Sequence, residues 1–130
     1  MHVVPTYAAL LALIFVGLSV RTLRLRRRLR IGVGDGGDRL MLRAMRVHAN
    51  FAEYVPLTLL LLYFVEAAGA GALWLHALCA ALVAGRLIHA YGVSQVQEQY
   101  GFRVAGMVLT LGVLVTAAVR LLFDGGRTIF

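Results

Sequence analysis

Cysteine, lysine and acidic residues are scarce or missing in this chain. Cys79 is the only cysteine among the 130 residues, which excludes a disulfide framework and a zinc-finger module. Lysine is absent, and 6 Asp and Glu stand against 13 Lys and Arg, giving a net charge of +7. In a soluble chain this excess would suggest nucleic-acid binding. Because 61% of the residues are hydrophobic and the mean hydropathy is +0.83, the sequence predicts a membrane protein instead.

Charged residues are also missing from four stretches of the sequence. The stretches free of Asp, Glu, Lys and Arg are Met1 to Val20, Tyr54 to Val65, Ala67 to Gly85 and Val104 to Val119. A helix needs roughly 20 apolar residues to cross the hydrocarbon core of a bilayer. The second stretch is too short alone, so we expect its helix to begin earlier, near Leu40. The sequence therefore predicts an all-α protein, a bundle of four transmembrane helices, with one domain over residues 1–130.

The positions of the arginines predict how the chain sits in the membrane. The first helix is expected to be retained, because basic residues follow the apolar run, whereas they precede it in a signal peptide. Eleven arginines flank the connections expected at Ile31 to Asp38 and Tyr91 to Gly101; they are Arg21, Arg24, Arg26, Arg27, Arg28, Arg30, Arg39, Arg43, Arg46, Arg86 and Arg103. The positive-inside rule places these connections in the cytoplasm and both termini outside. The cluster "RTLRLRRRLR" favours anchoring at anionic lipid, with nucleic-acid binding as the alternative.

Polar residues form a stripe on the second expected helix. At 100° per residue, Arg43, Arg46, Asn50 and Glu53 fall within about 80° of one another. His48 points nearly the opposite way. A structural interpretation is available for two members of the stripe: Glu53 would neutralise a buried arginine, and Asn50 would hydrogen-bond a neighbouring helix.

The third and fourth expected helices bring further polar groups to the same depth. Arg86 and His89 share one face of the third helix, and Arg103 shares a face of the fourth with Thr110. His89 has no second His, Cys or carboxylate at metal-ligand spacing, so we expect no metal site. Cys79 is expected to be a buried, unreactive thiol.

Three motifs occur in an order that resembles a known family. "RVHANFAEYVP" followed by "LTLLLL", then "RLIHAYG", then "RVAGMVLT" resemble the MAPEG family, the membrane-associated proteins of eicosanoid and glutathione metabolism, and in particular its small bacterial branch. The resemblance runs from about Arg39 to Thr116. The spacing R-x-x-x-N-x-x-E of Arg46, Asn50 and Glu53 is its most specific element.

The resemblance implies a homotrimer in the bacterial inner membrane, with glutathione held as co-substrate between neighbouring subunits near the cytoplasmic face. It assigns Arg46, Asn50 and Glu53 to the tripeptide. The same role falls to Arg86 and His89, and the resemblance places Arg103 against the cysteine sulfur. The implied activity is that of a microsomal glutathione transferase or peroxidase acting on apolar electrophiles or lipid hydroperoxides. The alternative within the same fold is a non-catalytic lipid-binding or scaffold protein.

The chemistry of glutathione agrees with this residue set. Glutathione carries two carboxylates, an amine and a thiol, so its site needs arginines for the carboxylates, a carboxylate for the amine and a cation for the thiolate. Arg46 and Arg86 would serve the first need, Glu53 the second and Arg103 the third. Lowering the pKa of a free thiol from about 8.5 to about 6.5 requires roughly 2.7 kcal/mol of thiolate stabilisation.

Two departures from the eicosanoid-type members bear on the substrate. Those members tend to carry a hydroxyl residue directly after the arginine that faces the thiolate, and a tyrosine about one turn later; this chain has Val104 and Met107 there. The sequence therefore argues against prostaglandin or leukotriene synthesis. Tyr91 and Tyr100 are the candidates to replace the lost contacts. A small proton-coupled exporter has a similar length, but the first helix lacks the acidic residue that it would need.

Overall fold

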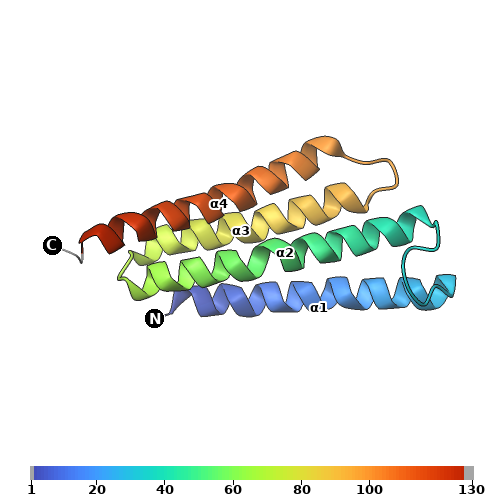
Figure 1. Cartoon of the computed structure of the whole chain (residues 1–130), viewed down its shortest axis with the longest axis horizontal. Coiled ribbons are helices and arrows are strands. Elements are labelled where there is room, and N and C mark those ends of the chain that lie inside the picture. Colours follow the sequence, from blue (N-terminus) through green and yellow to red (C-terminus); the bar gives the residue numbers. More distant parts are fainter. Residues whose placement is uncertain (1, 128–130) are drawn as a thin grey trace.

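The computed structural model describes residues 2–127, which form four α-helices. The helices are α1 (Val3–Leu29), α2 (Arg39–Ala67), α3 (Ala72–Ser94) and α4 (Tyr100–Arg127). They lie side by side along the long axis of the molecule, and consecutive helices run in opposite directions (Figure 1). The predicted all-α bundle of four helices is confirmed.

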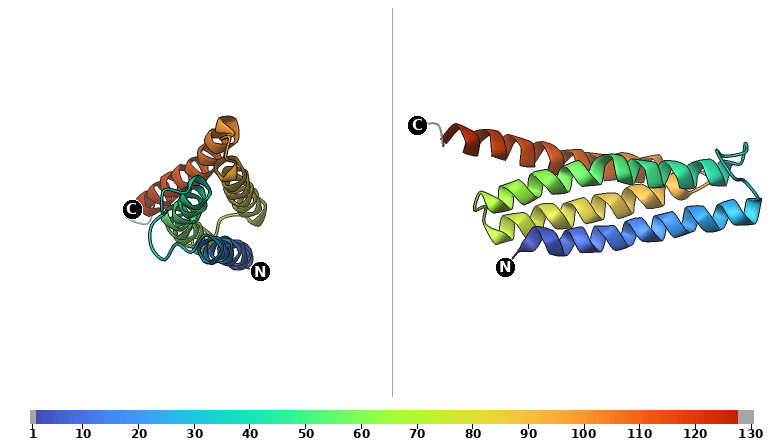
Figure 2. Two further views of the ribbon diagram at one scale, coloured as in Figure 1. Left: turned by 90° about the vertical axis from the view of Figure 1, so that its right-hand side faces the viewer. Right: turned by 60° about the horizontal axis from the view of Figure 1, so that its bottom comes forward.

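The two ends of the bundle hold different parts of the chain. Both termini and the turn between α2 and α3 lie at one end, which we call the terminal end (Figure 1). The connections at 30–38 and 95–99 lie at the other, which we call the loop end. In the right-hand view of Figure 2, the last part of α4 extends beyond the other helices at the terminal end. Leu122 and Phe123 there are accordingly 77% and 72% exposed.

All four helices are long enough to cross a bilayer. Three of them are also sufficiently apolar by composition, over Val3–Leu29, Ala72–Ser94 and Tyr100–Asp124. Helix α2 carries more charge, but its 29 residues extend over about 44 Å, which exceeds the roughly 30 Å of a hydrocarbon core. Its start at Arg39 agrees with the expectation of a start near Leu40. Asp38 fixes that start, because its side chain accepts a hydrogen bond of 2.8 Å from the backbone N–H of Met41.

Helix α1 is longer than its charge-free stretch. It continues beyond Val20 through the arginine cluster to Leu29, because arginine is a good helix former and its charge is favourable near a helix C-terminus. Arg30 ends the helix in the left-handed region, at φ 57°. The N–H of Ile31 then bonds to the carbonyl of Arg26 at 3.0 Å, as in a Schellman motif.

The connection between α3 and α4 is shorter than the sequence suggested. Tyr91 to Gly101 was the expected link, whereas α3 continues to Ser94 and α4 begins at Tyr100. Close packing explains the difference: a Cβ added to Gly92 would lie 2.8 Å from the backbone N of Arg103. The two helices therefore approach each other closely up to their ends, and only a few residues are left to join them.

Glycines also set the spacing of α3 and α4 deeper in the bundle. A Cβ at Gly106 would lie 2.6 Å from the carbonyl oxygen of Gly85 and 2.6 Å from the backbone N of His89. Only glycine fits such a backbone approach. The apolar core lies next to this contact and is shared by all four helices, with Leu11, Leu62, Leu82 and Ala117 each 0% exposed.

The terminal end has polar contacts of its own. The carboxylate of Glu66 accepts hydrogen bonds from the backbone N–H groups of Val3 and Val4. It thus satisfies two of the free donors at the N-terminus of α1. The hydroxyl of Tyr7 hydrogen-bonds with Nδ1 of His76 at 3.2 Å. These contacts tie α1 to α2 and α3 far from the polar stripe.

Candidate functional site

Helix α2 turns part of its polar stripe, Arg43 and Asn50, toward α3 at the loop end. Arg43 and Asn50 are half-buried on this face, and Arg46 is exposed. His48 lies on the opposite face, where its ring stacks on Phe15 at 4.7 Å and its Nε2 hydrogen-bonds with a serine of α1 at 3.0 Å. The opposite orientation predicted for His48 is therefore confirmed, and it packs against α1.

Arg86 is the centre of a buried polar network beneath this face. It is 1% exposed, and one terminal nitrogen donates to Oδ1 of Asn50 at 2.7 Å and to Nδ1 of His89 at 3.0 Å. The other terminal nitrogen donates to the hydroxyl of Thr110 at 3.4 Å. The guanidinium also lies 5.8 Å from the ring centroid of Phe51. One cation thus connects α2, α3 and α4.

The network sets the hydrogen-bonding state of His89. A guanidinium has donors only, so Nδ1 of His89 accepts the bond from Arg86 and the ring proton of the neutral imidazole is on Nε2. His89 is 3% exposed and lies against Gly106, where a Cβ would come within 2.6 Å of its backbone and side chain. Helix packing and Arg86 together hold this ring in one orientation.

Glu98 is the residue of the candidate site that sequence patterns missed. It lies in the connection between α3 and α4, outside any helical periodicity, and its carboxylate accepts a hydrogen bond of 2.8 Å from Arg103. It also lies 3.7 Å from the guanidinium of Arg43, which donates to the carbonyl of Val93 at 3.1 Å. The hydrogen bond from Arg103, with the charges of Arg103 and Arg43, holds the pKa of Glu98 below its usual range.

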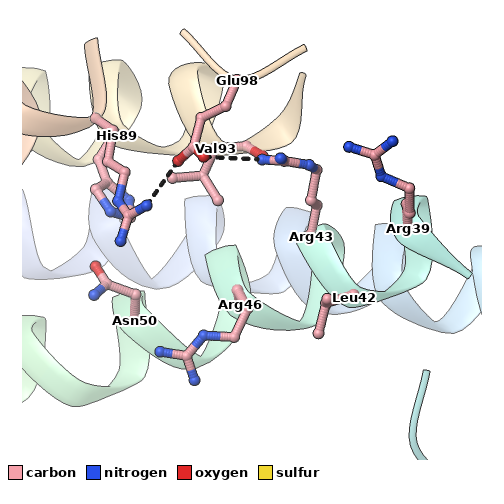
Figure 3. A pocket seen from close by; sticks show the side chains of 9 residues that line it. Arg39, Leu42, Arg43, Arg46, Asn50, His89, Val93 and Glu98 are labelled. Carbon is pink, nitrogen blue, oxygen red and sulfur yellow. Dashed lines mark hydrogen bonds and ion pairs between the residues drawn. The ribbon is translucent and has the colours of Figure 1, made fainter. Parts of the chain in front are cut away.

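These groups surround a cavity of about 230 Å³ at the loop end. Figure 3 shows the carboxylate of Glu98 directed toward Arg43, and the side chain of Arg46 pointing away from Glu98. The complete lining is Arg39, Leu42, Arg43, Arg46, Asn50, His89, Val93, Glu98 and Arg103. Four guanidinium groups and one carboxylate leave the lining with three positive charges, so the cavity suits an anion with more than one acidic group.

Most of the site residues expected from the sequence meet at this cavity. Arg46, Asn50, His89 and Arg103 line it. Arg86 does not line it, but holds two of the lining side chains from below. Glu53 is exposed on α2 and is not part of the lining within this chain.

The two tyrosines considered as replacements lie elsewhere. Tyr91 is 56% exposed and packs edge-on against Phe102, with ring centroids 5.5 Å apart. Tyr100 is 69% exposed. Neither contributes to the lining of the cavity.

Comparison with known proteins gives the family. The model of the MAPEG family matches residues 4–123. The chain is also 38% identical over 104 residues to a protein named inner membrane protein YecN in Escherichia coli K12, over 80% of this chain and 78% of that protein. The YecN protein of the E. coli O6:H1 strain CFT073 matches over the same share. Together with its apolar helices, these matches show that the chain is an integral membrane protein and that it belongs to the MAPEG family.

Proposed function

We propose that this protein binds glutathione in the loop-end cavity and activates its thiol against apolar electrophiles or lipid hydroperoxides, as a membrane glutathione transferase or peroxidase. The observation that carries the proposal is the charge of the lining, four arginines against one carboxylate. Glutathione brings two carboxylates, one ammonium group and a thiol, so its net charge is opposite to that of the cavity. Membership of the MAPEG family supports the same ligand.

Contacts already present in the cavity support a carboxylate ligand. Arg103 and Arg43 both pair with the carboxylate of Glu98, which demonstrates that their guanidinium groups converge on one anionic group. In the proposal, a glutathione carboxylate binds Arg43 or Arg46, and Asn50 hydrogen-bonds the peptide backbone. Arg86 acts as a positioning residue, because its donors fix Asn50 and His89 and it is too deeply buried to line the cavity.

Arg103 is the residue assigned to the thiolate. Its side chain is half exposed, at 50%, and its guanidinium borders the cavity. A cation next to the sulfur favours the thiolate over the thiol, and a shift from about 8.5 to about 6.5 in the thiol pKa needs roughly 2.7 kcal/mol. The thiolate then forms a bond to the electrophilic carbon of a transferase substrate, with departure of its leaving group where it has one. With a hydroperoxide, sulfur attacks the distal oxygen, the O–O bond breaks, and the alkoxide leaves and takes up a proton from water to become the lipid alcohol. A second glutathione converts the resulting sulfenic acid to the disulfide and water.

A trimer explains the placement of Glu53. Glu53 and Arg46 lie on the outward face of α2, in line with Leu57, Leu60 and Phe64, which are 52%, 48% and 48% exposed. Charged side chains on a lipid-facing helix are costly, so we propose that this face packs against a neighbouring copy in a homotrimer. Glu53 would then reach the glutathione amine at the subunit boundary.

The orientation proposed for the trimer puts the loop end and its cavity in the cytoplasm and both termini outside. Gly32 offers a test, because it lies in the connection between α1 and α2 and a Cβ added there meets no atom within 4 Å. In a Cys79→Ala background, Gly32→Cys should react with an impermeant maleimide only after cells are broken open. Labelling of intact cells from outside would refute this orientation.

A second candidate function is lipid binding without catalysis. An apolar cavity of about 260 Å³ between α1 and α2 favours it. Its lining consists of Ala8, Leu11, Ala12, Phe15, Phe51, Ala52, Val55, Pro56 and Leu59. The same cavity would serve a transferase as a place for an apolar substrate, so glutathione binding is what separates the two candidates.

The deciding experiment is a calorimetric titration of the purified protein with reduced glutathione and, separately, with ophthalmic acid, its analogue without a thiol. We expect both to bind, because the carboxylates provide most of the recognition, and only glutathione to give a thiolate absorbance in the ultraviolet. Arg46→Leu should weaken both ligands. Binding of neither ligand by a well-folded trimer would eliminate the enzymatic proposal, and binding without a thiolate signal would eliminate thiol activation.

A further inference from the structure

A second basic region lies on α1, away from the loop-end cavity. A groove of about 630 Å³ runs along the last turns of α1 to the start of α2. Its lining is Gly17, Val20, Arg21, Arg24, Leu25, Arg28 and Leu40. The three arginines recur at i, i+3 and i+7, so they project from one face of the helix. No acidic residue lines the groove.

The arginines of the groove differ in how they are held. Arg21 donates to the hydroxyl of Ser94 at 2.6 Å, which anchors it to α3. Arg24 and Arg28 are exposed and form no hydrogen bond or ion pair with any residue that the structure describes. The nearby carboxylates are engaged in the connecting loop: Asp38 caps α2 and Asp35 accepts from a backbone N–H. Two cations are therefore available to an external anion.

The floor of the groove is apolar and open. A Cβ added to Gly17 would meet no atom within 4 Å, so this glycine leaves space beside the helix. Val20 and Leu40 are 37% and 38% exposed along the same path. Below the arginines, α1 contains only uncharged residues back to the start of the helix. The groove thus changes from cationic to apolar where a membrane helix leaves the hydrocarbon core.

We propose that this groove is a binding site for an anionic phospholipid, with the phosphodiester on Arg24 and Arg28 and the upper part of one acyl chain over Gly17. Charge complementarity and the apolar floor argue for a lipid, because a free phosphate or a nucleic acid would use the arginines and leave the floor unoccupied. The site differs from diffuse attraction to an anionic surface in having a shape as well as a charge.

Native mass spectrometry of the protein in an uncharged detergent tests the proposal. Phosphatidylglycerol and phosphatidylcholine with identical chains are the probes, and we expect preferential retention of phosphatidylglycerol. Arg24→Gln with Arg28→Gln should reduce that retention about tenfold or more, because both charge-assisted hydrogen bonds to the phosphodiester are lost. The matched control is Arg27→Gln with Arg30→Gln, which removes two charges outside the groove and should reduce retention much less, because only the diffuse attraction to the headgroup is weakened.

A second pair of variants tests the shape without altering charge. Gly17→Phe fills the floor and should lower retention of phosphatidylglycerol, whereas Leu13→Phe, at a site 70% exposed outside the groove, should not. Circular dichroism and size-exclusion chromatography would establish that each variant is folded.

Three results would each overturn the proposal. Equal losses in the two double arginine variants would indicate diffuse electrostatics. Equal retention of the two lipids would show that the groove does not recognise an anionic headgroup. Displacement of the lipid by glycerol phosphate or by a short RNA, at concentrations equal to that of the lipid, would assign the arginines to a different ligand.

Discussion

The α3–α4 interface and the outer surface of α1 both combine arginines with glycines, but they are built in different ways. Between α3 and α4, Gly106 brings two backbones into contact, and Arg86 and Arg103 each have protein partners. On α1, Gly17 borders open space, and Arg24 extends outward with no partner among the described residues. The comparison teaches that the neighbours of an arginine decide its role: a tight interface fixes the side chain in one geometry, and an open surface leaves it available to an external ligand.

The largest expected effect comes from Gly106→Leu, which disrupts the close packing of α3 against α4. Its Cβ alone would come within 2.6 Å of backbone atoms in α3, so α3 and α4 must separate, and the hydrogen bond from Arg86 to Thr110 of α4 must break. We expect a loss of about 3 kcal/mol or more in the free energy of unfolding, measured by thermal circular dichroism in detergent. Gly112→Leu is the matched control on the same helix, because a Cβ there meets no atom within 4 Å, and it should change stability by less than about 0.5 kcal/mol. Equal effects would mean that glycine packing does not hold α3 to α4.

Helical periodicity made the α2 face of the site predictable. Arg43, Arg46 and Asn50 recur at spacings of three and four residues, and such spacing brings side chains to one face wherever the helix lies. The early start of α2 followed from the same logic, since an apolar stretch of 12 residues cannot span a bilayer.

The contacts between helices were not predictable in this way. The partners of Arg86 on other helices depend on how the helices pack: α2 brings Asn50 to the guanidinium, and the close approach of α4 at Gly106 accompanies the contact with Thr110. Glu98 lies in a connecting segment, where helical periodicity does not predict which way a side chain points. Its pairing with Arg103 and Arg43 could therefore be seen only in the three-dimensional structure.

Arg86→Met tests the buried network with a smaller expected effect. The substitution keeps an apolar side chain at this position but removes the guanidinium. Oδ1 of Asn50 and Nδ1 of His89 then lose their hydrogen-bond donor. Each unsatisfied acceptor costs about 1 kcal/mol or more, so we expect a loss of about 2 kcal/mol in stability. Glutathione affinity should fall, with the rate at saturating glutathione largely retained, because Arg86 positions other groups.

Arg46→Met provides the contrast for this experiment. Arg46 is exposed and lines the cavity, so its loss should weaken affinity and leave the unfolding midpoint unchanged. A destabilised Arg86→Met protein with unchanged affinity would show that the buried network is structural only.

Arg103→Leu addresses the chemistry itself. If Arg103 lowers the thiol pKa from about 8.5 to about 6.5, its removal should reduce the thiolate fraction at pH 7 about 25-fold. The rate of conjugation of an apolar electrophile should fall with it, and glutathione affinity should fall less. Arg103→Lys should retain part of the signal, because it keeps a cation without the planar donor set. An unchanged thiolate absorbance in a folded Arg103→Leu protein would exclude Arg103 as the thiolate partner.

The smallest expected effect is that of Glu98→Gln on glutathione affinity, and whether the affinity rises or falls distinguishes two roles of Glu98. Glu98 occupies the arginines that are proposed to receive glutathione, through Arg103 at 2.8 Å and Arg43 at 3.7 Å. If a ligand carboxylate or thiolate must replace it there, removal of this competing charge should raise glutathione affinity about two- to fivefold at neutral pH. If Glu98 instead binds the glutathione amine, affinity should fall, and the competition account would be rejected. Asp124→Asn is a suitable control, because it removes a carboxylate from the pair with Arg120 at the terminal end and should leave affinity unchanged.

The pH dependence of the free energy of unfolding provides an independent test of whether Glu98 acts through its charge. Arg103 lowers the pKa of Glu98 in the folded protein from its ordinary value of 4.5, so the stabilisation due to this ion pair is fully present above that value. It disappears as the pH falls through the lowered pKa and the carboxylate becomes protonated. The parent should therefore be slightly more stable than Glu98→Gln near neutral pH, and the two should converge in acid. A difference that persists unchanged below the lowered pKa would show that Glu98 stabilises the loop end by packing and not by its charge, in which case it would not compete electrostatically with an anionic ligand.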